Sequence, residues 1–453
     1  MNALLLSLPL IVASPGSALG RAQAAPELRA TLAEAVASAE ADSPALRSAQ
    51  AEWKAAVSRS ESRWSGRWPE LTAESSYKFA GEVPSLSVIP GRTQSLGDHH
   101  NYSLGPSLSW TLWDQGARRD AWLAAVSAAR ARAEDVDAQR RQARLKTRLA
   151  YFQAQLALEQ VRLLADSLKL AQSQYGDIEK RRQAGASSRL DSLSAHQEVL
   201  ARLRQFRQAR SDLAAALRDL YALTGKEPSE DLSLPLDGRT APLPEDVEPA
   251  SVLIALDPLE DSLKSLAAVE AGALDAGHPG VAALRESARS YKLSAGGTRA
   301  GLWPRLGFTG RTSLEYPNGP VLEAFHQNTV GVFASMPLFE FGRTRREAAS
   351  FERQAEAADE RAEAARRDLA RDWRKAKDQL LGLKAQKTLC LQAVSEAREA
   401  ADLTYESYKA GRVTFIEVQS ANLREIEARV QAARIDAQAL MQLASLASLA
   451  EKE

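Results

Sequence analysis

The chain is 453 residues long, and its 58 Lys and Arg side chains are balanced by 58 Asp and Glu side chains. This balance gives no support to a nucleic-acid partner, because proteins that bind nucleic acid usually carry a basic excess. The only cysteine, Cys390, excludes a disulfide within the chain and a cysteine-based metal cluster. Ala, Leu, Arg, Glu and Gln dominate long stretches, a composition that indicates long helices or coiled coils.

The N-terminal segment, residues 1–24, is expected to be an export signal. Residues 3–13 are apolar apart from Ser7 and Pro9, and small residues suited to cleavage follow. No Lys or Arg precedes the apolar run, so a plain apolar tail is the alternative interpretation. Beyond this segment no apolar run approaches the roughly 20 residues that a membrane-spanning helix needs. A membrane-spanning form of this chain would therefore have to use strands.

Short motifs recur in the same order along the chain, which indicates an internal duplication. We therefore expect a first repeat over residues 25–225 and a second over residues 259–453. Six prolines in residues 226–258 break the helical pattern, so this segment is expected to link the repeats. The recurring motifs are Trp68-Pro69-Glu70-Leu71 with Trp303-Pro304-Arg305-Leu306, residues 112–116 with 338–342, and Ala184-Gly185 with Ala410-Gly411.

Equal intervals between equivalent glycines predict long helices. Gly116 to Gly185 and Gly342 to Gly411 each span 69 residues, as expected where packing along a helix forbids insertions. Neither interval contains proline. In the first interval, apolar residues recur at three-, four- and seven-residue spacing, as in the seam of a coiled coil: Leu145, Leu149, Phe152, Leu156, Leu163 and Leu170. A helix of that length would extend about 100 Å at 1.5 Å per residue. We expect helical hairpins that turn near residues 185 and 411.

Period-two alternation before each long helix predicts a β-hairpin, over about residues 69–113 in the first repeat and 304–339 in the second. In residues 102–112, Tyr, Leu, Pro, Leu, Trp and Leu form one face, and Ser, Gly and Thr form the other. Strands of about ten residues with an apolar outer face and aromatics near their ends are typical of membrane barrels. A half-buried sheet of a water-soluble protein gives a similar pattern and is the alternative. The fourth strand is expected to run to Leu338.

The two hairpins differ in length. Trp68 to Gly116 spans 48 residues, whereas Trp303 to Gly342 spans 39, so residues 81–100 are expected to form a longer hairpin tip. Four strands cannot close a barrel, and lipid does not tolerate an open sheet edge, so at least two copies must assemble. The expected fold class is mainly α with a membrane β-barrel portion, internally duplicated, with four strands per protomer.

Several motifs together resemble the TolC outer-membrane efflux protein family. They are residues 32–36, residues 43–46, the two Trp-Pro-x-Leu strand openings, the strand ends that close at Gly116 and Gly342, and residues 408–418. The resemblance implies a homotrimer in which twelve strands form one barrel and the helical hairpins form a hollow periplasmic α-barrel. It also implies location in the outer membrane of a Gram-negative cell, and contact with a periplasmic adaptor and an inner-membrane pump.

The resemblance also implies which residues contact the adaptor and which narrow the closed pore at the periplasmic end. The helix turns that contact the adaptor correspond to Gly185, Ala186, Gly411 and Arg412. The two glycines also have a purely structural interpretation, as left-handed positions that end a helix.

The acidic positions that narrow the closed pore correspond to Glu417 and Ser420, and the serine departs from the acidic pattern. A structural salt bridge is the alternative for Glu417. Asp191 lies six residues after Gly185, as Glu417 does after Gly411, and is a further gate candidate, although it could face outward.

The resemblance favours a passive outer-membrane conduit that exports small molecules such as drugs or metal ions. A type I protein-secretion channel is the alternative within the family, and a periplasmic coiled-coil scaffold or adaptor is the alternative from another class. No catalytic motif was found, so no enzyme activity, cofactor or metal is expected. The cluster Asp98-His99-His100 is expected to be a solvated part of the hairpin tip rather than a metal site.

Overall fold

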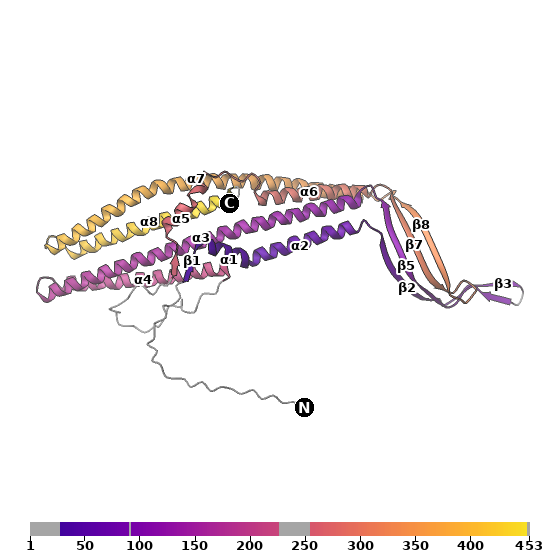
Figure 1. Cartoon of the computed structure of the whole chain (residues 1–453), viewed down its shortest axis with the longest axis horizontal. Helices are drawn as coiled ribbons and strands as arrows, with labels where there is room; N and C mark the ends of the chain where they lie inside the picture. Colours follow the sequence, from indigo (N-terminus) through magenta and orange to yellow (C-terminus); the bar gives the residue numbers. More distant parts are fainter. Residues whose placement is uncertain (1–27, 90–91, 226–253, 451–453) are drawn as a thin grey trace, which may run out of the picture.

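The computed structural model describes residues 28–89, 92–225 and 254–450. The expected export signal and most of the proline-rich segment 226–258 lie outside these residues. The molecule is elongated, with a four-stranded sheet at one end and two helical hairpin turns at the other (Figure 1). Nearly everything between the two ends is helix.

The long helices and the strands of the main sheet follow the same order in both repeats, and the first repeat has one additional hairpin. The first repeat contains β1 (Leu28–Ala30), α1 (Leu32–Asp42), α2 (Pro44–Ser65), β2 (Glu70–Phe79), β3 (Ser85–Ile89), β4 (Arg92–Ser95), β5 (His100–Trp113), α3 (Ala117–Gln183) and α4 (Arg189–Thr224). The second contains β6 (Ile254–Leu256), α5 (Leu259–Leu266), the 3-10 helix η3 (Ala267–Ala271), α6 (Pro279–Ala300), β7 (Arg305–Tyr316), β8 (Phe325–Ser335), α7 (Arg343–Lys409) and α8 (Phe415–Leu449).

The long helices have the predicted extent. Helices α3 and α7 each contain 67 residues, which corresponds to about 100 Å at 1.5 Å per residue. Helices α2 and α6 each contain 22 residues and begin with proline at their first position, after the N-caps Ser43 and His278. Proline suits this position because its missing N–H would have no partner there. The prediction of an uninterrupted helix between each pair of equivalent glycines is confirmed.

The sheet has the order β2-β5-β7-β8, and every neighbouring pair is antiparallel. Strands β5 and β7 therefore join the two repeats, while β2 and β8 form the two edges. The fourth strand ends at Ser335 rather than at the expected Leu338. Pro337 lies just beyond that end and has no backbone N–H to donate to a ladder.

The longer hairpin tip is not an irregular loop. Strands β3 and β4 pair antiparallel and extend the β2–β5 hairpin beyond the rest of the sheet (Figure 1). His99 and His100 make contacts with the adjoining strands: a ring nitrogen of His99 lies 2.8 Å from the Ala80 carbonyl oxygen, and one of His100 lies 2.9 Å from the Tyr77 hydroxyl.

The hydrophobic core lies midway along the helices, where α3 meets α4, α5 and α8. Tyr151, Phe152, Leu440 and Leu446 are fully buried there. The Tyr151 hydroxyl donates a 3.0 Å hydrogen bond to Asp257, which ties the segment after β6 to α3. Phe152 lies on the predicted apolar seam of α3. Leu170 also belongs to the predicted seam but is 41% exposed, so the seam does not continue unbroken to the tip.

Candidate functional site

The sheet has one apolar and one polar face, as the alternation predicts. Register places Leu71 opposite Leu108, Trp110 opposite Phe308, and Phe308 opposite Val332. The residues between them point to the other side, which carries mainly Ser, Thr, Glu and Arg. Many apolar side chains are well exposed in the single chain, among them Leu71, Tyr77, Phe79, Leu104, Val330 and Val332. Such a face requires a cover of lipid or protein.

Aromatic residues mark both ends of the apolar face. Tyr77, Tyr102 and Tyr316 form a row at the end next to the hairpin tip, with neighbouring ring centroids 5.2 and 6.0 Å apart. Trp110 lies near the helix end of the same face. From Tyr102 to Trp110 there are eight residue steps, or about 27 Å along a strand at 3.4 Å per residue. A barrel tilt of roughly 35–45° would shorten this to about 19–22 Å, somewhat less than the roughly 25 Å height of an outer-membrane apolar band.

The polar face contains a charged network. Arg311 on β7 lies 3.6 Å from Glu74 on β2 and donates a 2.7 Å hydrogen bond to Ser103 on β5. Ser107 donates a 2.7 Å hydrogen bond to Glu74. This face suits a water-filled interior, because Arg311 and Glu74 are of opposite charge and both side chains remain partly open to solvent.

Each strand turns into its long helix through two residues with positive φ. These are Gln115 (52°) with Gly116 (84°), and Phe341 (51°) with Gly342 (78°). A carboxylate caps each helix start: Asp114 accepts from the N–H of Arg118, and Glu340 accepts from the N–H of Thr344. The Thr344 hydrogen bonds hold the pKa of Glu340 below its ordinary value. The bend from strand to helix is thus built the same way in both repeats.

The two helical hairpins turn at Gly185 and Gly411, where φ is 76° and 74°. Gly185 donates to the Arg182 carbonyl at 3.0 Å and Ala186 to the Arg181 carbonyl at 2.8 Å, which is the Schellman pattern that ends a helix. The second hairpin repeats the pattern with Gly411 and Arg412. A side chain at either glycine would find open space, so positive φ is what requires glycine. The interpretation of both glycines as left-handed helix ends is confirmed.

The residues after the two turns differ in their contacts. Asp191 belongs to a capping box: its carboxylate accepts from the Ser188 N–H at 3.3 Å, and its own N–H donates to the Ser188 hydroxyl at 3.0 Å. Glu417 is exposed and accepts one 3.3 Å hydrogen bond from the Thr414 hydroxyl, without a capping box. Ser420 is exposed, and its hydroxyl donates to the Ile416 carbonyl within the same helix.

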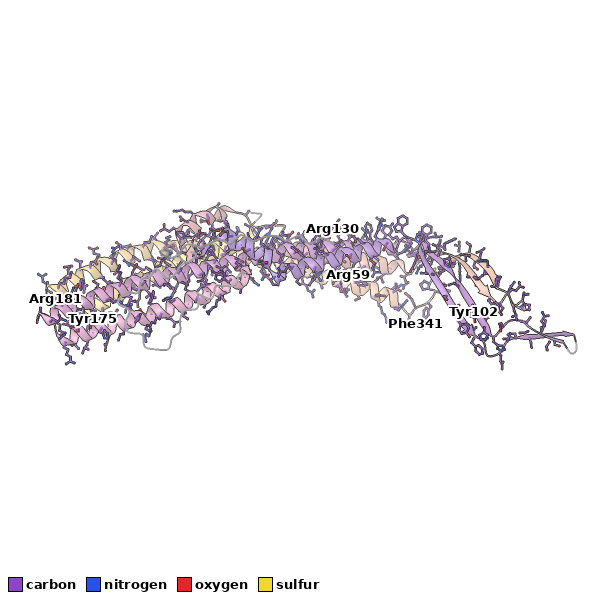
Figure 2. The ribbon with its side chains drawn as sticks, turned by 60° about the horizontal axis from the view of Figure 1, so that its bottom comes forward. Arg59, Tyr102, Arg130, Tyr175, Arg181 and Phe341 are labelled. Carbon is purple, nitrogen blue, oxygen red and sulfur yellow. The ribbon has the colours of Figure 1, made fainter. Side chains whose placement is uncertain are left out.

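The two hairpins pack against each other close to their tips. Ile178, Ala195, Phe415 and Val418 form a small buried cluster between them. A guanidinium nitrogen of Arg181 at the end of α3 donates a 2.8 Å hydrogen bond to the carbonyl of Lys409 at the end of α7. Figure 2 places Arg181 at the opposite end of the molecule from Tyr102 in the sheet.

Polar side chains extend this contact. The Tyr405 hydroxyl donates to Asp177 at 3.1 Å, and the Asn422 amide donates to Gln174 at 3.0 Å in a buried position. Sequence reasoning missed these residues, because partners up to 248 positions apart leave no local pattern. The one sequence feature that could have identified these residues is their position near the recurring turn glycines.

No helix in the described ranges is both long and apolar enough to cross a membrane. The same residues contain no group of three His, Cys, Asp or Glu side chains arranged to hold a metal ion.

A duplicated chain that combines a two-faced sheet with 67-residue helices defines an elongated, strand-anchored helical channel subunit. The chain belongs to the outer membrane efflux protein family, whose sequence pattern matches residues 35–226 and 273–450. The protein is accordingly a subunit of an outer-membrane efflux channel that extends into the periplasm. This assignment removes the alternative of a periplasmic scaffold, and the family is one of channel proteins.

Solved structures of channel proteins have the same fold. CusC is similar with a TM-score of 0.73 at 17% identity, covering 93% of this chain and 92% of CusC. The Campylobacter jejuni CmeC outer membrane channel gives 0.72 at 17% identity, covering 92% and 85%. The open state of the Neisseria gonorrhoeae MtrE outer membrane channel gives 0.71 at 18% identity, covering 94% and 88%. Comparison with curated protein sequences gives no match.

Proposed function

We propose that three copies of this chain form one continuous channel that serves as the outer-membrane conduit of a tripartite efflux system. The observation that carries the proposal is the four-stranded sheet with β2 and β8 as open edges. An unpaired edge is costly in lipid, where no water satisfies its N–H and C=O groups. Three such sheets joined edge to edge would bring twelve strands, within the range of outer-membrane barrels.

The tips are the proposed contact with a periplasmic adaptor, which in turn joins an inner-membrane pump. The turns lie at the end of the molecule opposite the sheet (Figure 1), and Gly185, Ala186, Gly411 and Arg412 are all exposed. The tips also differ in chemistry, since Arg181 and Arg182 precede the first turn and Tyr408 and Lys409 the second. Two kinds of tip would give the adaptor two kinds of docking position around the channel.

Glu417 is the proposed gate residue. Its exposed carboxylate lies next to the tip, and threefold symmetry would place three of them in one ring. A ring of carboxylates in a narrow pore attracts cations and repels anions. Asp191 is a weaker gate candidate because its carboxylate caps α4. Ser420 would contribute a hydroxyl but no charge.

The proposed cargo is small molecules, such as drugs or metal ions. The test is a deletion strain complemented with the gene, in which dye retention, drug or metal sensitivity and secreted proteins are measured. The expected result is an outer-membrane trimer in mild detergent and restored efflux of small molecules. Restored secretion of a protein without any effect on small molecules would instead assign the channel to type I secretion. A soluble monomer in the periplasm would overturn the proposal.

A further inference from the structure

The two repeats of each protomer meet at an internal joint. The elements that form this joint have counterparts at the two open edges of the protomer. Inside the chain, β5 pairs with β7 and α3 packs on α6, and these contacts join the two repeats. The edges left open are β2 with α2 on one side and β8 with α7 on the other. By the duplication, β8 and α7 are the counterparts of β5 and α3, and β2 and α2 are the counterparts of β7 and α6. The open edges therefore have the same elements as the internal joint.

The correspondence between the repeats holds residue by residue in the helices. Helices α2 and α6 have equal lengths and begin 235 positions apart, at Pro44 and Pro279. Helices α3 and α7 also have equal lengths and begin 226 positions apart, after the left-handed Gly116 and Gly342. Each contact across the internal joint can thus be transferred to the joint between two protomers without adjusting the register.

The strands give an independent check on this transfer. Inside the chain, Leu104 pairs with Leu314. The same register between protomers places Val330 opposite Phe79 and Val332 opposite Tyr77. These four side chains lie on the apolar face and are between 58% and 74% exposed in the single chain. A slip by one residue would set the apolar face of one strand against the polar face of the other, whereas the transferred register preserves both faces.

The helices give a specific pair of residues. Inside the chain, α6 approaches α3 closely at Gly296 and Gly297, and a Cβ atom on Gly296 would lie 3.1 Å from a carboxylate oxygen of Asp120. The counterpart of Gly296 on α2 is Glu61, and the counterpart of Asp120 on α7 is Arg346. The two counterparts carry opposite charges.

Both counterparts are exposed in the single chain. Within the described residues, neither has an ion-pair partner, although many other charged side chains on α3 and α7 are paired with neighbours on their own helix.

We propose that the joint between protomers copies the internal β5–β7 and α3–α6 joint, and that Arg346 forms an ion pair there with Glu61 of the partner subunit. The inference rests on the proposed homotrimer and names the contact that closes it. Two long side chains occupy the place of a glycine and an aspartate, so α7 and the neighbouring α2 stand farther apart than α3 and α6. The partner is a second copy of this chain, because both halves of the pair lie on opposite edges of one protomer.

The first test is cysteine cross-linking in a Cys390→Ser background, which removes the native thiol. The double variant Glu61→Cys/Arg346→Cys should give dimers and covalent trimers on denaturing gels after outer membranes are treated with a bis-maleimide, because its two reactive ends span more than a disulfide can. The matched control is Gly296→Cys/Asp120→Cys, at the same place in the internal joint, which should give only an internal cross-link and a monomer band. Each single-cysteine variant should also remain a monomer.

The second test keeps the proposal open to refutation if the cysteine variants assemble poorly. Glu61→Arg and Arg346→Glu should each lower the temperature at which the trimer dissociates in mild detergent, and the double charge exchange should restore it. A trimer that forms normally but shows neither the cross-link nor the restoration would overturn this joint and leave the proposed channel standing. Failure of the unmodified protein to form any oligomer would overturn the proposed function itself.

Discussion

The hydroxyl of Tyr405 on α7 donates a 3.1 Å hydrogen bond to a carboxylate oxygen of Asp177 on α3, about two turns before the hairpin tips. Burial, and next the bond to Asp177, raise the pKa of Tyr405 to about 12. The contact joins the two repeats where the channel wall approaches its tip. It therefore couples the position of one hairpin to the position of the other.

This coupling predicts a pH dependence at the tips. An unfolded tyrosine ionises near pH 10, and Tyr405 in the folded tip ionises near pH 12. Its contribution to stability is therefore constant below about pH 10 and falls as the pH rises from 10 to 12. Proteolysis of the tips should accelerate over this window in the native protein, and the Tyr405→Phe variant should lack that component. A phenolate of Tyr405 that forms near pH 10, seen in the absorbance difference between the two proteins, would contradict the prediction.

Substitution of the turn glycine should damage docking without preventing assembly. Gly411→Val forces a β-branched residue into positive φ, at a cost of about 1–2 kcal/mol. Efflux should fall while the trimer persists in mild detergent. The matched control is Gly382→Val in the middle of α7, where a side chain also meets open space but φ is not positive. Equal loss of efflux in both variants would show that turn geometry is not the cause.

Removal of the proposed gate carboxylate should change ion selectivity. Glu417→Ala is expected to reduce cation preference in planar-bilayer recordings, because the variant would remove three carboxylates from the proposed gate. Asp191→Ala is the control: it removes the N3 carboxylate of the capping box and should destabilise the start of α4 by about 0.3–1.5 kcal/mol with little effect on selectivity. If the two variants exchange these effects, the gate lies on the first hairpin.

The pairing of β5 with β7, which joins the two repeats, should not tolerate an added methyl group at Gly105. A Cβ atom at Gly105 on β5 would lie 2.0 Å from the Thr312 carbonyl oxygen on β7, a backbone atom that cannot move aside. Gly105→Ala should therefore separate β5 from β7 and reduce the amount of protein in the outer membrane. Gly331→Ala on β8 meets only the Thr309 hydroxyl at 3.4 Å and should be tolerated. Normal membrane levels of Gly105→Ala would exclude this tight pairing.

The hairpin extension should face the cell exterior. An epitope tag inserted between β3 and β4 is expected to bind antibody on intact cells and to leave efflux intact, because these strands lie beyond the sheet on the side away from the helices (Figure 1). A tag in the helical tip after Ala186 is the comparison and should be reachable only after the outer membrane is opened. The reverse pattern would mean that the topology is inverted.

Much of this structure could be predicted from the sequence, because short patterns along the chain determine its helices, strands and turns. The long helices follow from apolar residues at helical spacing, and the two-faced strands follow from alternation along the chain. The turns at Gly185 and Gly411 follow because a chain reversal at positive φ requires glycine. The repeated motifs then showed that one unit occurs twice.

Tertiary structure alone decided which elements meet. No local pattern specifies that β5 pairs with β7, or that Tyr405 reaches Asp177 across 228 positions of sequence. These features depend on backbones and side chains brought together by packing, and their partners are set by distance in space rather than by distance along the chain.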